Sequence, residues 1–221
     1  MIFATHPDFY VIAKPSGIGM HQDGEQPGLI TQLNDFTGED LFPVHRLDKD
    51  TSGLLIVARS ARAAASFGKL FENREIEKFY IALAGNKPRK KQGAIKGDMA
   101  KGRNGSWMLK TSQTNPAVTY FFSHGTNTGM RLYILRPVTG KTHQLRVALK
   151  SIGAPIFGDT RYKGDSAPRL LLHAMALRFL WKGSEHSYVL PPSELSDFPQ
   201  LDWTLFPNIL TPWLYPWPTK T

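Results

Sequence analysis

The chain has no cysteine among its 221 residues, and this absence removes several classes of chemistry. Without a thiol there is no disulfide, no cysteine-ligated zinc, no iron–sulfur cluster and no cysteine nucleophile. The absence agrees with a reducing compartment such as the cytoplasm, where disulfides are rare. Hydrophobic residues make up 41% and charged residues 20% of the chain, which excludes a disordered or collagen-like polypeptide.

A long apolar run and an N-terminal leader are also missing. The most apolar stretch, residues 170–181, is interrupted by His173 and Arg178 and is too short to span a bilayer. The first eight residues have neither a basic leader nor the small-residue cleavage site of a signal peptide. We therefore expect a cytoplasmic protein that does not enter a membrane.

Negative charge is scarce in one part of a chain whose net charge is +9. Residues 86–111 hold eight lysines and arginines but a single acid, Asp98, and are rich in glycine, which predicts a mobile loop or a short ribbon. The charge fits either a solvated loop or an RNA-binding segment. A second stretch, residues 136–150, is basic without any acid and favours the nucleic-acid interpretation. The candidate RNA contacts of the first segment are Lys87, Arg89, Lys90 and Lys91.

The hydrophobic pattern predicts several strands and three helices. The expected strands are residues 9–14, 54–58, 79–83, 118–123, 131–135, 170–177 and 187–190. One helix is expected over residues 29–36, a second after an N-cap at Ser60, and a third between a cap at Thr142 and Gly153. Hairpin-like strands with so few helices favour an α+β fold on a mostly antiparallel mixed sheet with flanking helices.

The composition changes after residue 190. The last 31 residues hold 7 of the 16 prolines and 3 of the 5 tryptophans. Proline is a poor strand or helix former, whereas tryptophan needs an apolar surface to cover. We therefore expect one domain over residues 1–190 and a C-terminal extension over residues 191–221 that packs on it, with partner binding as a lesser possibility.

The densest polar sequence is the segment from His45 to Gly53, placed directly before an apolar strand. Four interpretations stay open from the residues alone. Asp48 or Asp50 could form an Asx-type turn, or both could bind a cation with His45 in a metal-dependent phosphoesterase. Asp48 could instead be a nucleophile or general base kept ionised by a guanidinium. The segment could also belong to an RNA-binding surface without chemistry.

A family resemblance distinguishes these interpretations. Residues 45–55, His-Arg-Leu-Asp-Lys-Asp-Thr-Ser-Gly-Leu-Leu, resemble the signature loop of the RluA-type RNA pseudouridine synthases. Other motifs of that family are also present, in the order in which the family has them. They are residues 14–17 with His21, before the signature loop, and residues 78–82, 140–146, 158–159, 162–164 and 171–174 after it. The resemblance covers about residues 9–180. It implies an isomerase with a pseudouridine synthase catalytic domain, acting on a uridine in rRNA or tRNA as a monomer and without a metal or organic cofactor.

The resemblance also assigns roles to single residues. Asp48 is expected to be the catalytic carboxylate, Arg146 the cation that keeps it ionised, and Tyr80 the ring that stacks on uracil or exchanges its proton. Contacts to the substrate are expected from His45, Arg46 and Leu172. Without the resemblance, Tyr80 is an ordinary core aromatic, Arg46 and Arg146 are surface charges, and His173 is a core histidine.

Overall fold

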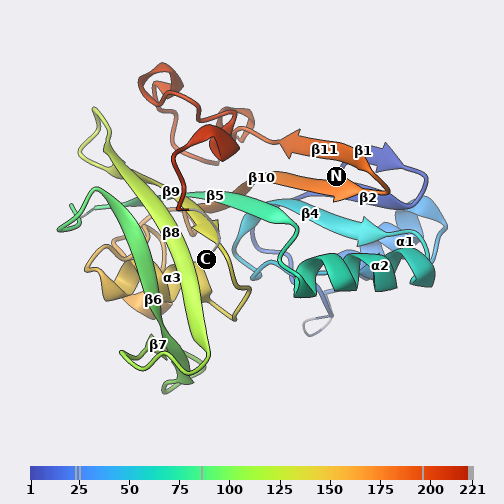
Figure 1. The fold of residues 1–221 in the computed structure, drawn as a ribbon, viewed down its shortest axis with the longest axis horizontal. Helices are drawn as coiled ribbons and strands as arrows, with labels where there is room; N and C mark the ends of the chain where they lie inside the picture. The colour runs from blue at the N-terminus through green and yellow to red at the C-terminus, as the bar shows by residue number, and fades with distance from the viewer. Residues whose placement is uncertain (23, 25, 86, 196, 219–221) are drawn as a thin grey trace. The chain divides into compact units, whose positions relative to one another are not determined.

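The computed structural model of the chain describes residues 1–22, 24, 26–85, 87–195 and 197–218. The α-helices in these residues are α1 (Leu29–Thr37), α2 (Ala61–Glu72) and α3 (Gln144–Ser151). The strands are β1 (Ile2–His6), β2 (Phe9–Lys14), β3 (Phe42–Pro43), β4 (Ser52–Ala58), β5 (Glu77–Ala84), β6 (Gln92–Lys101), β7 (Trp107–Leu109), β8 (Pro116–Gly125), β9 (Arg131–Pro137), β10 (Leu172–Trp181) and β11 (Ser184–Val189). Short 3₁₀ turns are η1 (Thr160–Tyr162), η2 (Pro192–Glu194), η3 (Trp203–Leu205) and η4 (Pro212–Leu214). The predicted α+β class is confirmed (Figure 1).

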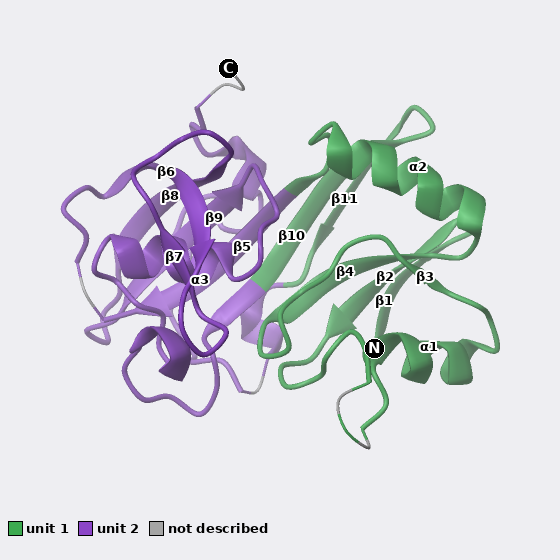
Figure 2. Ribbon diagram, turned by 90° about the horizontal axis from the view of Figure 1, so that it is seen from below, with its two compact units in different colours: residues 1–77, 174–190 green, residues 78–173, 191–221 purple. Residues whose placement is uncertain are grey.

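The chain forms two compact units (Figure 2). Unit 1 comprises residues 1–77 and 174–190, and unit 2 comprises residues 78–173 and 191–221. The predicted end of the first domain, residue 190, is where the chain passes from unit 1 to unit 2 for the second time. The functional division into residues 1–190 and 191–221 stays a prediction.

Unit 1 is built on strands in the order β1-β2-β4-β10-β11, with β3 also pairing with β4. The pairing of β2 with β4 is antiparallel and sets Phe9 opposite Ala58 and Lys14 opposite Gly53. Every residue of β4 is buried, as expected for an apolar strand covered on both faces. Helix α2 packs beside β4, and its N-terminus is capped as predicted, because Ser60 Oγ accepts a hydrogen bond from the Ala63 amide.

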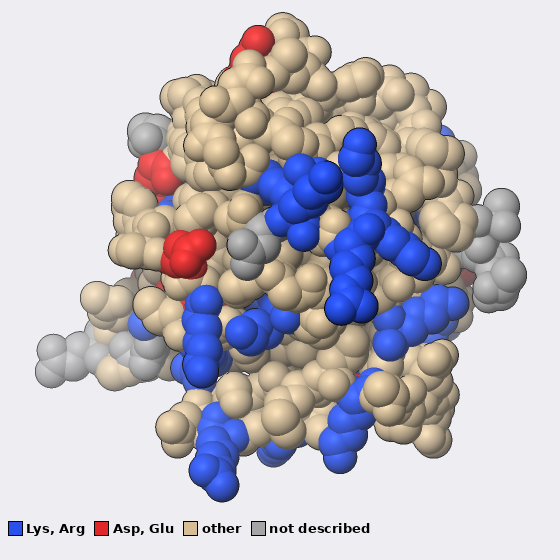
Figure 3. All heavy atoms as spheres, turned by 90° about the vertical axis from the view of Figure 1, so that its left-hand side faces the viewer, with Lys and Arg blue, Asp and Glu red and all other residues tan. Residues whose placement is uncertain are grey.

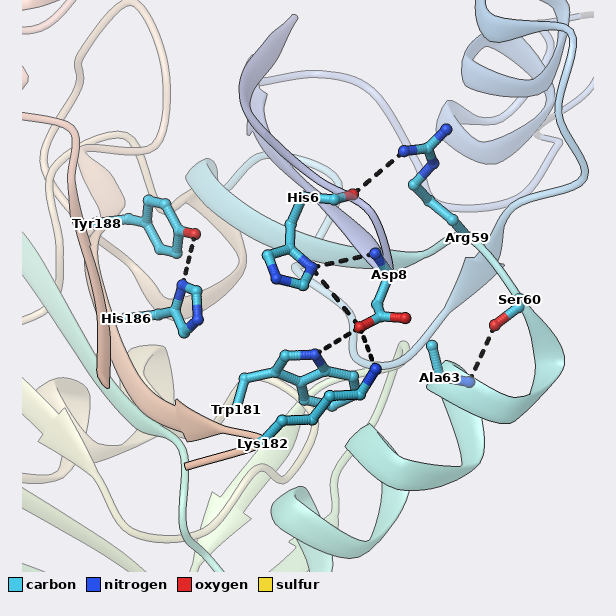
Figure 4. Close-up of polar contacts among 9 residues, drawn as sticks. All are labelled: His6, Asp8, Arg59, Ser60, Ala63, Trp181, Lys182, His186 and Tyr188. Atoms are coloured by element: carbon cyan, nitrogen blue, oxygen red, sulfur yellow. Dashed lines mark hydrogen bonds and ion pairs between the residues drawn. The ribbon is translucent and has the colours of Figure 1, made fainter. Parts of the chain in front are cut away.

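The core of unit 1 is rich in aromatic rings. Phe9 packs edge-to-face on Phe67 with ring centroids 5.3 Å apart, and Phe67 stacks on Trp181 at 4.1 Å. Figure 4 shows how the turn after β1 is tied to β10: the Asp8 carboxylate accepts hydrogen bonds from Trp181 Nε1 at 2.9 Å and Lys182 Nζ at 2.7 Å. These contacts join the turn between β1 and β2 to the end of β10.

Unit 2 is built on strands in the order β5-β9-β8-β6-β7, all paired antiparallel. The basic segment expected as a mobile loop or ribbon is largely a ribbon: β6 runs along β8 and folds back as β7. Residue 86 of that segment lies outside the described residues. Helix α3 follows β9, and the predicted cap at Thr142 is wrong, because His143 is the N-cap and has a left-handed φ of 56°.

The C-terminal segment belongs to unit 2 and contacts its strands. Trp217 lies 6.0 Å from Phe79 of β5 and 4.8 Å from Phe122 of β8, measured between ring centroids. Tyr215 packs on Phe122 at 5.0 Å, and burial raises its pKa to about 12. The tryptophans and tyrosine of this segment therefore cover apolar surface of unit 2.

Candidate active site

The loop that carries Asp48 is fixed to the end of β2 by a buried lysine. Lys14 is 2% exposed, and its Nζ donates hydrogen bonds to the carbonyls of Pro15 at 2.9 Å, Ile18 at 2.8 Å and Lys49 at 2.9 Å. An ammonium group has three N–H donors, so these carbonyls use its full capacity. One of these carbonyls belongs to Lys49, the residue directly after Asp48. Lys14 therefore holds the backbone next to the candidate catalytic position.

The turn after Lys14 adds two further anchors. The Gly17 amide also donates to the Lys49 carbonyl at 3.0 Å, and Ser16 Oγ donates to the Asp50 carbonyl at 2.7 Å. Within the loop, the Thr51 amide donates to the Asp48 carbonyl at 3.1 Å. The loop backbone from Asp48 to Thr51 is thereby held in one conformation.

The first residue of the motif, His45, is bonded to β4, and the last, Gly53, lies in β4 against β10. His45 Nε2 accepts a hydrogen bond from the Ile56 amide at 2.9 Å, and its ring lies 4.7 Å from Phe71 of α2. Gly53 has φ 119°, and a Cβ there would come within 2.2 Å of the Ala174 carbonyl oxygen in β10. Glycine is required at this position because the two backbones approach closely.

Arg146 occupies a buried site on α3. It is 6% exposed, and its Nε and Nη2 donate to the two carboxylate oxygens of Asp159 at 2.8 Å each. The alternative of a surface charge on the helix is therefore wrong, whereas the role of Arg146 beside Asp48 stays a prediction. The carboxylate uses two of the five N–H donors of the guanidinium, and such a two-point pair fixes the orientation of its plane.

A tyrosine of η1 connects this ion pair to the ribbon of β6 and β7. The Arg146 guanidinium carbon lies 5.1 Å from the centre of the Tyr162 ring, within the range of a cation–π contact. Tyr162 Oη accepts a hydrogen bond from the Trp107 amide at 3.0 Å and lies 2.9 Å from His143 Nδ1. Burial raises the pKa of Tyr162, which favours the protonated hydroxyl in the contact with His143.

The other predicted site residues of unit 2 lie on strands. Tyr80 is on β5 opposite Leu135 of β9 and is 8% exposed; Leu172 and His173 begin β10 at 3% and 0% exposed. Lys78, two residues before Tyr80, is half-buried, and desolvation lowers its pKa. His45, Arg46 and Asp48 share the anchored loop of unit 1, whereas Tyr80, Arg146 and Leu172 belong to unit 2.

Unit 2 also carries exposed lysine and arginine side chains outside these strands. Lys87, Arg89, Lys90 and Lys91 are all exposed in the turn between β5 and β6. Figure 3 shows one face of the molecule, on the side of β6, β8 and α3, where lysine and arginine side chains far outnumber acidic ones. A surface of this composition attracts polyanions.

Three residues of this site had no role predicted from the sequence. Lys14, Asp159 and Tyr162 all stand inside the family motifs, and each of them is buried. Among the described residues, no group of three or more histidine, aspartate or glutamate side chains is arranged to hold a metal ion. No helix in the described part of the chain is long and apolar enough to cross a membrane.

Comparison with known proteins assigns the family. The RNA pseudouridylate synthase family matches residues 8–151. An uncharacterized RNA pseudouridine synthase of Haemophilus influenzae is 47% identical over 193 residues, covering 86% of each chain. The ribosomal large subunit pseudouridine synthase C of Rickettsia bellii is 34% identical, and the match covers 78% of this chain but 62% of that protein.

A solved structure agrees with the sequence comparisons. The human RNA pseudouridylate synthase domain containing 1 protein superposes with a TM-score of 0.73 at 27% identity, covering 87% of this chain and 83% of that one. The fold is that of an RNA pseudouridine synthase domain. The chain belongs to the RNA pseudouridylate synthase family, and its enzyme class is accordingly that of an isomerase.

Proposed function

We propose that this protein isomerises a specific uridine in ribosomal or transfer RNA to pseudouridine, with Asp48 as the catalytic carboxylate. The observation that carries the assignment of Asp48 is its anchored loop: Lys14, Ser16 and Gly17 hold the backbone at Lys49 and Asp50, directly after Asp48. A catalytic group must be held within a fraction of an ångström of its working position, and a fixed backbone provides this. Family membership supports the reaction type.

The proposed reaction rearranges one nucleoside without a second substrate. The bond from the sugar to the uracil nitrogen breaks, the base rotates, and a bond from the sugar to a ring carbon forms. The proton on that carbon is released, and the nitrogen that left the sugar takes up a proton, so the product is an isomer of uridine. The uracil ring cannot be reached inside a helix, so the nucleotide is turned out of its stack into the protein. Asp48 either attacks the sugar carbon or removes a sugar proton, and both routes require its ionised form.

Arg146 is the proposed counter-charge of the reaction. A carboxylate brought against a nucleoside loses solvation, which favours its neutral form, and a nearby cation reverses this effect. Two N–H donors of Arg146 bond to Asp159, and this two-point pair orients the guanidinium. Arg146 keeps this pair while its positive charge stabilises the ionised form of Asp48.

The remaining residues are proposed to hold the RNA. Tyr80 stacks on the uracil ring or exchanges its proton, Leu172 forms part of the pocket floor, and Arg46 fills the space left by the displaced base or binds a phosphate. His45 is proposed to contact the substrate as well, in addition to accepting the hydrogen bond from the Ile56 amide. The exposed cations of the turn between β5 and β6 bind the phosphate backbone; they are Lys87, Arg89, Lys90 and Lys91.

The name of the Rickettsia relative makes large-subunit ribosomal RNA the first substrate to test, although that protein is considerably longer than the matched segment. Transfer RNA is the other substrate that the family resemblance implies. We also propose that the protein acts in the cytoplasm, which fits an RNA substrate, and we expect it to act as a monomer.

The test compares Asp48→Asn with a matched control, Asp50→Asn, in the same loop. Each purified protein is incubated in chelator with total RNA from a strain that lacks the gene, and new pseudouridines are mapped by carbodiimide-blocked primer extension. We expect specific stops with the wild type and with Asp50→Asn, and none with Asp48→Asn, because an amide is neither a nucleophile nor a base. Wild-type levels of product with Asp48→Asn would remove Asp48 from the mechanism.

The same experiment separates the two other functions considered from the sequence. A metal-dependent phosphoesterase would cleave RNA, and chelator would abolish that activity. An RNA-binding module without catalysis would bind RNA equally well with either substitution and produce no new stops. The stops themselves identify the modified RNA and the uridine.

A further inference from the structure

The end of the β6–β7 hairpin forms a basic surface together with η1. We define the hairpin patch as Lys101, Arg103, Arg161 and Lys163, all of which are exposed. The two segments touch: Arg161 Nη1 donates a hydrogen bond to the Asn104 carbonyl, and it lies over Gly105, where a Cβ would be 3.1 Å from it. Four like charges on two adjoining segments repel one another, and this repulsion opposes folding unless an anion is bound there.

The acidic residues of these segments do not neutralise the patch. Asp98 is the only acid of residues 92–113, and its carboxylate accepts hydrogen bonds from the Thr114 and Asn115 amides at 3.1 and 2.8 Å. Asp159, the only acid of residues 156–164, is buried against Arg146. The next acid, Asp165, is directed to the end of β5, where a Cβ on Gly85 would lie 2.9 Å from its Oδ2.

The hairpin that carries the patch is a closed turn rather than a loose loop. Asn104 and Gly105 both have positive φ, 52° and 68°, which is the pattern of a type I′ hairpin turn. The Ser106 amide donates to the Arg103 carbonyl at 3.0 Å, and the Gly102 amide donates to the Ser106 carbonyl at 2.8 Å. The bond between the Trp107 amide and Tyr162 Oη then fixes the hairpin to the segment that supports Arg146.

From these observations we propose that the hairpin patch binds phosphates of the RNA backbone outside the modified nucleotide. The proposal rests on the RNA substrate of the proposed function and adds a second binding surface to the turn between β5 and β6. Because the patch is fixed to the elements around Arg146, RNA held there has a defined position relative to that side chain. Contacts to phosphates position an RNA without reading its sequence, so the patch contributes affinity and not the choice of uridine.

The test removes two charges from the patch and two from elsewhere. Lys101→Gln with Arg103→Gln is compared with a matched control, Arg62→Gln with Lys69→Gln, which removes two exposed charges of α2. Binding of an in vitro transcribed large-subunit ribosomal RNA is measured from low to high salt. The slope of log K against log salt is negative, and each lost phosphate contact makes it shallower by about 0.7 to 0.9. The slope of the hairpin variant, which lacks two charges, is therefore expected to be shallower than that of the wild type by about 1.4 to 1.8.

Turnover on the RNA identified by the mapping experiment gives an independent readout. We expect the hairpin variant to raise KM roughly tenfold at low salt with kcat unchanged, because phosphate contacts stabilise the bound substrate and the transition state equally. The control is expected to match the wild type in slope and KM. Thermal unfolding of both variants checks that neither change affects the fold.

Three outcomes would overturn the proposal: an unchanged salt slope in the hairpin variant, an equal loss of slope in both variants, or a fall in kcat without a change in KM. The first excludes RNA at this surface, the second shows that only overall charge matters, and the third assigns the residues to another step. Failure of the proposed function is recognised separately, because then the wild type itself forms no pseudouridine that depends on Asp48.

Discussion

Lys14 shows how much one buried side chain contributes to the candidate site. Its ammonium group satisfies three backbone carbonyls from two segments, residues 15–18 and residue 49. Burying a charge is costly unless it is fully hydrogen-bonded, and here every N–H has a partner. The motif containing Lys14 was visible in the sequence, but a lysine at the end of a strand, next to Pro15, is ordinarily a surface residue. Its role follows only from the three-dimensional arrangement.

At this scale we expect Lys14→Met to destabilise the protein and disorder the loop of Asp48. Methionine fills the space but removes the ammonium donor from the Pro15 and Ile18 carbonyls and leaves the Lys49 carbonyl with the Gly17 amide alone. The free energy of unfolding should therefore fall by roughly 3 kcal/mol. Activity should fall even at temperatures where the variant is folded, because the backbone next to Asp48 loses its anchor. Chemical denaturation and turnover measure the two effects. Lys69→Met, at an exposed position of α2, is the control and should change neither.

An unaltered stability in Lys14→Met would mean that water or neighbouring groups replace the ammonium, and the loop would then owe its conformation to Ser16 and Gly17. Normal activity together with lowered stability would show that the anchor supports the fold but does not position Asp48.

Among the elements, those with a strong local signal were predicted well. Helix α2 begins after Ser60, and Ala63 and Phe67 of its predicted apolar stripe are buried in the core of unit 1. The hairpin of β6 and β7 also has a strong signal in Asn104-Gly105, but the surrounding glycines and lysines favoured a loop. Helix α3 was placed one residue early because His143 has a left-handed conformation, which a sequence pattern does not reveal.

The surface-charge interpretation of Arg146 was wrong for a different reason. The helix that carries Arg146 was expected, but the residues alone gave no sign that this side chain is buried. Its burial depends on Asp159 and Tyr162, which are more than ten residues away in the chain. Pairing of a charge with a distant partner is a tertiary property, so helical periodicity alone could not predict it.

At the element scale we expect Tyr162→Phe to loosen the hairpin while leaving Arg146 in place. The substitution keeps the ring under the guanidinium but removes the hydroxyl that accepts from the Trp107 amide. Loss of one such bond is worth about 1.4 kcal/mol, so the Trp107 amide should exchange with solvent roughly tenfold faster. The KM for RNA should rise more than kcat falls, because the hairpin carries two of the proposed phosphate-binding residues and Arg146 keeps its partner Asp159.

Hydrogen exchange measured by NMR and steady-state kinetics give the two readouts, and Tyr120→Phe, a buried tyrosine of β8, is the matched control. A Trp107 amide that exchanges at the wild-type rate would show that the hairpin does not depend on Tyr162. A large fall in kcat would instead place the hydroxyl in the support of Arg146.

At the scale of the whole molecule, the C-terminal segment contributes apolar cover rather than regular structure. Composition indicated that its tryptophans would be buried, and Trp217 contacts Phe79 and Phe122. The sequence did not identify which surface they would cover, because the segment consists of short 3₁₀ turns without a periodic pattern. His124 of β8 lies under it, 5.9 Å from Phe206 and 6.2 Å from Tyr215 between ring centroids.

His124 should make the stability of the protein depend on pH. Burial, and to a smaller extent the charge of Arg131, lowers its pKa in the folded protein below the ordinary value of 6.5. The buried Nε2 has no hydrogen-bond partner among the described residues, so protonation there is not compensated. As the pH falls below about 6.5, the unfolded chain takes up a proton that the folded protein does not, and the folded state loses stability.

We therefore expect the wild-type Tm to fall between pH 7.5 and 5 by more than that of His124→Gln, which has no titrating ring. Tryptophan fluorescence follows the unfolding, and three of the five tryptophans lie in the C-terminal segment. The pKa of His6 is lowered as well, but His6 is present in both proteins and its contribution cancels from the difference. An equal fall of Tm in both proteins would mean that the segment over His124 opens before the histidine binds its proton.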